Sequence, residues 1–172
     1  AGQIGNLLMA IVAEGKHGRV YLSPQTDQEK IAKVPKPKGY PDGTLPQNPR
    51  WFSPPAFGFA TYSSLFTNRQ LTALTTFCDC LPEVERPAER DALAAGCAAD
   101  GKGLAEGGSG AKAYGEAIKV YLSFVIDKMA DLGNALDRWE PVAQCPRQLF
   151  ARQAIPMVWD FAESNPFSNS SG

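Results

Sequence analysis

Prolines set the strongest limit on how this chain folds, because each one removes a backbone N–H donor and fixes φ. Eight of the fourteen prolines fall in residues 24–55, a stretch that is also rich in lysine, glycine and aspartate. Such a stretch suits neither a long helix nor a central strand, so we predict a long irregular segment that crosses the surface. Four aromatic residues are expected to anchor its far end to the core: Trp51, Phe52, Phe57 and Phe59.

A β-hairpin is predicted ahead of this segment. Residues 7–14 are apolar and β-prone, Gly15-Lys16-His17-Gly18 has turn chemistry, and residues 19–22 alternate between polar and apolar. A two-stranded hairpin is marginally stable alone in water, so we expect it to join further structure.

A capping box follows at Thr67-Asn68-Arg69-Gln70, where threonine and glutamine side chains are placed to bond each other's backbone amides. It predicts a helix that begins at Thr67 and carries an apolar stripe from Leu71 to Leu81. Pro82 and Pro87 are expected to break or kink this helix, with a further helix over residues 83–99.

The strongest helical periodicity covers residues 111–136, where apolar side chains recur every three or four positions. They are numerous enough that we expect this helix to be buried on much of its surface. The five glycines of residues 100–110 predict a flexible connection before it. A shorter helix is predicted from Pro146 to about Ile155, and residues 157–161 are expected to form a strand or a turn on the core.

The predicted fold class is therefore α+β and mostly α-helical: an N-terminal hairpin, a Pro-rich irregular segment and three to four packed helices. We expect residues 1–59 and 60–172 to form one compact domain overall, as an internal segment of a larger protein.

Charge and composition narrow the functions. The net charge is −1, so any nucleic-acid contact must come from a local basic patch. The longest apolar run, residues 7–13, is too short for a membrane span, and nothing around it is typical of a signal peptide. Reduced cysteines and a cytoplasmic location, with no membrane partner, are the expectation.

No complete catalytic, cofactor-binding or metal-binding set is expected in the chain. Cys78 and Cys80 lie two residues apart, so on a helix they point about 200° apart and do not share an ion. A single histidine, His17, excludes most nucleophilic triads. Residues 107–110 resemble a glycine-rich nucleotide loop but follow no strand, so a linker is the better interpretation.

Five basic residues are candidates for DNA contact: Lys16, His17 and Arg19 at the hairpin tip, and Arg147 and Arg152 near the C-terminal end. A solvated turn is an equally good interpretation of the tip. Asn165-Pro166-Phe167 is similar to the turn that presents a target amine in amino-methyltransferases, but it has one proline instead of two, which favours an ordinary turn with an anchored Phe167. Trp159 is expected in the core.

Four blocks carry a family resemblance. They are Gly18 to Pro24, Leu65 to Leu71, the helix around Tyr121-Leu122, and the long block from Arg152 to Phe167. In this order they resemble the zinc-ribbon-containing, adenine-specific DNA methylases of bacteria and archaea. The resemblance spans nearly the whole chain, and its last block is the most specific.

This resemblance implies that an S-adenosylmethionine loop and the zinc-ribbon cysteines lie upstream of the segment, and that the catalytic Asp-Pro-Pro-Tyr turn lies downstream. None of the three occurs in the chain, so no catalytic, cofactor or metal residue is carried over to it. The expected role is a non-catalytic segment of an adenine-N6 methyltransferase that contacts DNA or acts as a scaffold. A helical insert in this position would close over DNA and help extrude the base. The alternative is a structural or protein-interaction insert of a modification or phage-defence system, without DNA contact.

Overall fold

The structure is a computed structural model that describes residues 5–48, 50–151 and 153–168. The chain is α+β and mostly helical, as predicted. It divides into two compact units, which we call the mixed unit (Ala1–Ala73 and Asp131–Gly172) and the helical unit (Leu74–Ala130). Both boundaries lie inside long helices, so the units do not coincide with the expected division at residue 59.

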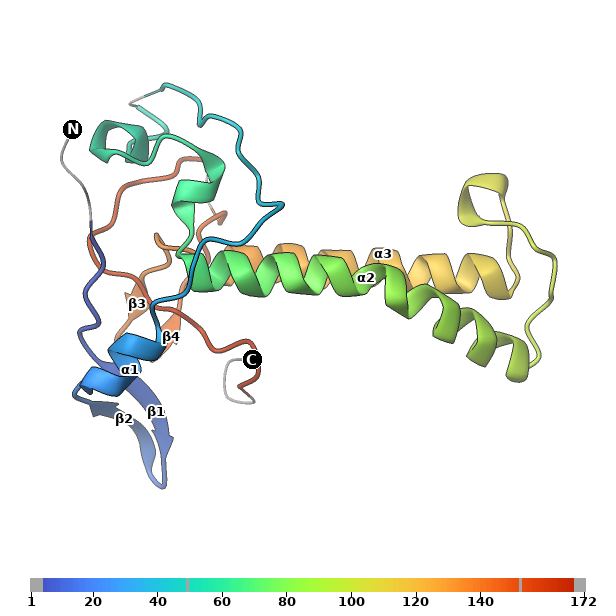
Figure 1. Ribbon diagram of the computed structural model, residues 1–172, viewed down its shortest axis with the longest axis horizontal. Coiled ribbons are helices and arrows are strands. Elements are labelled where there is room, and N and C mark those ends of the chain that lie inside the picture. Colours follow the sequence, from blue (N-terminus) through green and yellow to red (C-terminus); the bar gives the residue numbers. More distant parts are fainter. Residues whose placement is uncertain (1–4, 49, 152, 169–172) are drawn as a thin grey trace. The chain divides into compact units, whose positions relative to one another are not determined.

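The predicted hairpin is present in the mixed unit (Figure 1). Strand β1 (Ile11–Gly15) pairs antiparallel with β2 (Gly18–Leu22), with Ile11 opposite Leu22 and Gly15 opposite Gly18. Lys16 and His17 form the two-residue loop. Gly18 has φ 131°, a conformation that side chains disfavour, which explains a glycine at this position.

The Pro-rich segment is irregular, as predicted, apart from one helix that the prolines concealed. Helix α1 (Thr26–Ile31) follows directly after Pro24 and Gln25. The Gln25 backbone N–H donates to the Gln28 side chain at 2.8 Å, and Asp27 and Glu29 lie in the first turn, where acidic residues favour a helix. Beyond α1 the segment forms an isolated bridge between Thr44 and Thr61 and a short 3-10 turn at Pro54–Phe57.

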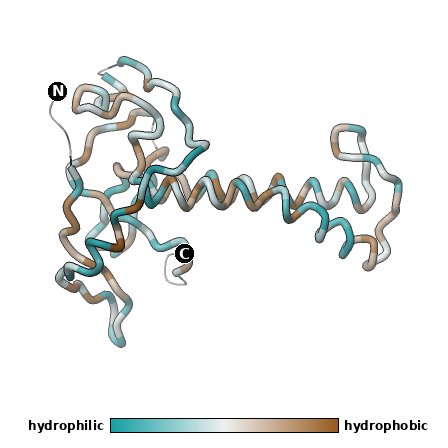
Figure 2. Tube along the Cα trace, in the orientation of Figure 1, coloured by the Kyte–Doolittle hydropathy of each residue, from teal (hydrophilic) through white to brown (hydrophobic). Residues whose placement is uncertain are grey.

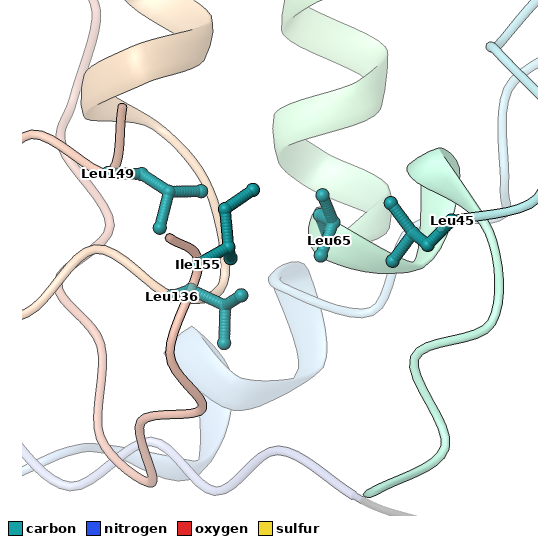
Figure 3. Packing of buried hydrophobic residues seen from close by; sticks show 5 residues of the cluster. All are labelled: Leu45, Leu65, Leu136, Leu149 and Ile155. Carbon is teal, nitrogen blue, oxygen red and sulfur yellow. The ribbon is translucent and has the colours of Figure 1, made fainter. Parts of the chain in front are cut away.

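The hydrophobic core of the mixed unit comes mostly from loops (Figure 3). Each of its five buried residues lies outside the long helices: Leu45, Leu65, Leu136, Leu149 and Ile155. Phe52 and Phe59 pack against this cluster and anchor the Pro-rich segment as predicted. Trp51 and Phe57 do not, because 45% and 41% of their surfaces stay exposed.

Helix α2 (Asn68–Ala94) begins at the predicted capping box. The Gln70 N–H donates to the Thr67 hydroxyl at 3.2 Å, and the Thr67 N–H donates to the Gln70 side-chain oxygen at 2.8 Å. Both residues are buried, so two amide donors that water cannot reach are satisfied.

Of the two expected effects of Pro82 and Pro87, a break or a kink, the structure has the kink: α2 continues through both prolines, so the prediction of a separate helix over residues 83–99 is wrong. Both prolines are exposed. Water can therefore bond the carbonyl groups that their missing N–H groups leave free, and their rings meet no packed neighbour. Figure 1 shows the consequence as a bend in the second half of α2.

Helix α3 (Ala111–Leu132) is four residues shorter than predicted. It lies antiparallel to α2 (Figure 1), and the contact is close at Gly115, where a Cβ atom would sit 2.7 Å from the Glu85 carbonyl oxygen. The Lys119 ammonium donates to the Glu85 carboxylate at 2.5 Å. The helix ends before Asn134, whose buried side chain accepts the Leu136 N–H at 2.9 Å and turns the chain.

The predicted helix over residues 146–155 is also wrong. Cys145–Pro146 forms strand β4, paired antiparallel with β3 (Trp139–Glu140). The backbone N–H groups that follow bond distant partners: Arg147 to the Arg138 carbonyl at 2.9 Å, and Ile155 to the Trp51 carbonyl at 2.7 Å. Tertiary hydrogen bonds therefore replace those a helix would have made. Residues 157–161 form no strand, but Met157 and Val158 pack on the core.

We predict that Thr67→Ala lowers the free energy of unfolding by about 1–2 kcal/mol, because it leaves a buried amide of α2 unsatisfied. Urea denaturation followed by circular dichroism measures this. Thr72→Ala is the matched control, since Thr72 is exposed on the same helix and its hydroxyl bonds the Asn68 carbonyl within it. An equal loss in both variants would show that the cap has no special role.

Candidate nucleic-acid interface

The hairpin tip presents two of the predicted DNA contacts. Lys16 and His17 are exposed in the loop between β1 and β2, whereas Arg19 is half-buried and lies opposite Glu14 in the pairing. The tip thus offers a lysine and a histidine to a ligand, with Arg19 next to an acidic neighbour.

Arg147 directly follows β4, and its guanidinium group lies near an acidic side chain. Its Nε lies 3.7 Å from the Glu140 carboxylate, which also contacts Arg138 at 3.4 Å. Arg152, the other predicted contact in this region, lies outside the described residues.

The structure does not gather the predicted contacts into one cluster. The ring of Tyr21 on β2 meets Trp139 on β3 edge to face at 6.3 Å. Tyr21 pairs with Val12, away from the loop, so the hairpin approaches β3 by its body and not by its tip.

The sequence interpretation missed a stronger basic feature, which we call the basic strap, residues 30–38. It contains four lysines and no acidic residue: Lys30, Lys33, Lys36 and Lys38. The last three have exposed side chains, and Lys30 is paired with Asp27. The Lys36 ammonium lies 3.7 Å from the centre of the Tyr40 ring and donates to the Ser63 hydroxyl at 3.1 Å. Lysines at every second or third position without an acid were the signal that could have revealed the strap.

The strap is fastened to the start of α2 through its backbone. The Arg69 guanidinium donates to the Ala32 carbonyl at 2.6 Å, and the Asn68 side chain donates to the Val34 carbonyl at 3.0 Å. These bonds hold the strap backbone, with the side chains of Lys33 and Lys38 exposed.

Arg69 also joins the C-terminal block through Glu163. Two guanidinium nitrogens donate to the two Glu163 oxygens, both at 2.7 Å, and the Thr67 hydroxyl donates to the same carboxylate at 3.3 Å. The hydrogen bond that Arg69 donates to Glu163 raises the pKa of Arg69, against an opposing effect of burial. Strap, helix start and C-terminal block are therefore connected by one arginine.

Charge divides unevenly between the units. The mixed unit has eleven basic and nine acidic residues, whereas the helical unit has six and nine. The net charges are thus +2 and −3. A polyanion is attracted to the first unit and repelled by the second.

One acidic residue of the mixed unit, Asp137, has a buried carboxyl group that tends to stay neutral, which makes the charge of this unit more positive than the count suggests. Asp137 follows α3 and is fully buried, and no hydrogen bond reaches its carboxyl oxygens from the described residues. Burial, and to a smaller extent the negative charge of Asp131, raise its pKa to about 7. The Arg147 N–H acts in the opposite direction, but its well-formed hydrogen bond goes to the Arg138 carbonyl. Below pH 7 Asp137 is therefore largely neutral.

Trp159 is not in the core, contrary to the prediction. It is 74% exposed, and its ring meets Phe57 edge to face at 5.4 Å. A second exposed indole, Trp51, has the Arg50 guanidinium 5.1 Å from its ring centre.

The two motif-like segments form ordinary local structure. Asn165 accepts the Phe167 N–H with its side chain at 3.0 Å and the Ser168 N–H with its carbonyl at 3.0 Å, which is the predicted turn. Phe167 is 80% exposed, so the expected anchoring of its ring is wrong.

In the glycine-rich connection, the Gly108 N–H bonds the Gly103 carbonyl and the Ser109 N–H bonds Asp100. The backbone N–H of Lys102 is the main cause of the lowered pKa of Asp100. These amides point at protein acceptors instead of converging on a phosphate, which favours the linker interpretation.

Comparisons with protein-family models, with curated protein sequences and with solved structures found no match. None of the helices in the described part of the chain has the length and apolar character that a membrane crossing requires. Likewise, the histidine, cysteine and acidic side chains described form no group of three that could hold a metal ion. Burial raises the pKa of the Cys78 thiol, and Asp79 and Asp127 raise it further, which makes this thiol a weaker ligand and nucleophile.

We predict that the stability of the protein falls as the pH rises from about 4 to about 7, and that Asp137→Asn removes much of this fall. The folded chain holds a proton on Asp137 up to about pH 7, whereas an unfolded chain releases it near 3.8. Stability from the protonated group is thus complete below pH 4 and lost as the pH rises through 7, a change on the order of a few kcal/mol.

Thermal denaturation across this pH range measures the effect as the difference between wild type and variant. Asp160→Asn is the control, because Asp160 is an exposed carboxylate in the same unit. Parallel pH profiles for wild type and Asp137→Asn would contradict the prediction.

Proposed function

We propose that this chain is a DNA-contacting, non-catalytic segment of an S-adenosylmethionine-dependent adenine DNA methyltransferase, and that the mixed unit makes the contact. The family assignment rests on the ordered blocks that resemble the adenine-specific DNA methylases. The observation that carries the DNA contact is the basic strap, where Lys33, Lys36 and Lys38 are exposed without an acidic neighbour in the segment.

The arrangement of the blocks supports this proposal. The block 65–71 and the block 152–167 lie far apart in sequence, yet Arg69 and Glu163 join them by two hydrogen bonds. Because the same arginine fastens the basic strap, the residues that carry the resemblance also position the proposed DNA contact. In this proposal the strap contacts phosphates and so positions the enzyme without reading sequence.

The charges support a DNA contact in a different part of the chain than the order of motifs indicated. A helical insert that closes over DNA was the expectation, but the helical unit carries a net charge of −3. We therefore place the proposed DNA contact on the strap and the hairpin tip, with Lys16 and His17 as secondary contacts. Catalysis, the methyl donor and zinc belong, in this proposal, to other parts of the methyltransferase.

We predict that the chain binds duplex DNA at low salt and that Lys33→Gln combined with Lys38→Gln weakens binding. The logarithm of the binding constant K falls as the logarithm of the salt concentration rises. Each lost phosphate contact makes this slope less steep by about 0.9, so the double variant should make it less steep by about 2. Fluorescence anisotropy with a labelled duplex over a salt series measures both affinity and slope. Lys36 stays unchanged, because its contacts with Tyr40 and Ser63 hold the strap.

The matched control is Arg86→Gln combined with Lys102→Gln, which removes the same charge from exposed positions of the helical unit. It should leave the slope unchanged. Equal slopes for the strap and control variants would refute a contact at the strap. Absence of binding at low salt would refute DNA contact by this chain.

The helical unit supports a second candidate function, which is binding to a partner protein. This unit repels polyanions by its net charge, and it buries no large apolar side chain: its buried residues are small ones such as Ala92, Ala111, Ala113 and Gly115. A helix pair without a core suits a partner protein better than a nucleic acid.

A further inference from the structure

Helix α3 has a second apolar face that α2 does not cover. α2 lies against Gly115 and Lys119. On the helix, Tyr114, Tyr121 and Val125 point roughly 100° or more away from that side. Their exposed fractions are 50%, 70% and 54%. The expectation that α3 is buried on much of its surface is therefore wrong within this chain.

The exposed face has the spacing of a coiled-coil seam. Successive positions alternate three and four residues apart over two heptads: Tyr114, Ala117, Tyr121, Phe124 and Lys128. Ala117 is half-buried, and the other four are exposed. Phe124 is 61% exposed, and Val120 beside it is 44% exposed. Figure 2 shows hydrophobic residues recurring along α3. Such a seam fits another helix, because knobs at this spacing enter the holes of a facing helix.

We propose that α3 packs antiparallel against α3 of a second copy of this chain, so that two helical units form a four-helix arrangement. This inference deepens the protein-interaction role of the helical unit and does not depend on DNA binding by the mixed unit.

The area agrees with what a dimer needs. With about 200 Å² for an aromatic side chain, Tyr114, Val120, Tyr121, Phe124 and Val125 expose roughly 500 Å² in each copy. Complete burial of these residues in two copies would remove at most about 1,000 Å² from water, which is the lower limit for a specific interface. A contact near this limit belongs to the class of weak, transient interfaces.

The seam is complementary to itself in the antiparallel direction. With the two-fold axis between Tyr121 and Phe124, Tyr121 of each copy faces Phe124 of the other, which forms two aromatic pairs. In the same register Lys128 faces Ala117, a small residue that leaves room for the lysine stem. A parallel pairing would instead set Lys128 against Lys128, so the charges favour the antiparallel direction.

Sedimentation velocity over a concentration series tests the association with the full chain. Wild type should form dimers, and Tyr121→Glu should raise the dissociation constant at least about 30-fold, the usual effect of losing a central aromatic residue. Tyr121 is 70% exposed, so circular dichroism should show unchanged helix content. Tyr121→Phe should still dimerise. Phe167→Glu is the matched control, because Phe167 is 80% exposed in the mixed unit and should have no effect.

The direction of packing has its own test at Ala117. In the antiparallel register Ala117→Glu meets Lys128 of the second copy and should retain the dimer, whereas Ala117→Lys meets a like charge and should weaken it at least about 10-fold. Loss of the dimer in both variants would refute the antiparallel register. A wild type that stays monomeric at all concentrations, or a Tyr121→Glu variant that dimerises equally well, would overturn the proposal. DNA binding that persists in a monomeric chain would leave the role of the mixed unit standing.

Discussion

The mixed unit depends on the contact between Arg69 and Glu163, which joins residues 94 positions apart. Its buried apolar residues come mostly from loops, and loops do not position one another as rigid helices do. One planar guanidinium with two carboxylate bonds has a defined geometry, and here it also bonds the strap carbonyl of Ala32. The capped start of α2, the C-terminal block and the proposed DNA contact are thus aligned around one side chain.

In the helical unit the main constraint is that α3 carries more apolar residues than one neighbouring helix can cover. One neighbouring helix covers one face of it, and the close approach at Gly115 uses small residues on that face. The remaining aromatic side chains stay exposed, and in our proposal a second copy of the chain covers them. The two units also differ in net charge, which is +2 for the mixed unit and −3 for the helical unit. A nucleic-acid contact by the first and a protein contact by the second are therefore physically compatible.

Short sequence motifs correctly predicted those parts of the fold that are stabilised by interactions between residues close together in the chain. The capping box, the hairpin turn and the Asn165 turn depend on residues within four positions of each other, and all three form as expected. Prediction failed where hydrogen bonds come from elsewhere, as at residues 146–155, or where solvent accommodates a proline, as at Pro82. The candidate site divides in the same way: the hairpin tip was visible in the sequence, whereas the strap became a candidate once its anchoring to Arg69 was known.

The sequence by itself determined the fold class, the starts of the two long helices, the irregular course of the Pro-rich segment and the net charge of −1, which limits any polyanion contact to a local basic patch. Propensity, capping and net charge are properties of neighbouring residues or of composition, so no tertiary contact is needed to infer them. Only the tertiary structure decided that the Asp137 carboxyl group is buried with no hydrogen bond from the described residues, that Trp159 is exposed, and that α3 keeps an exposed apolar face. Burial depends on which distant segments arrive to cover a residue, and this is decided by packing across the whole unit.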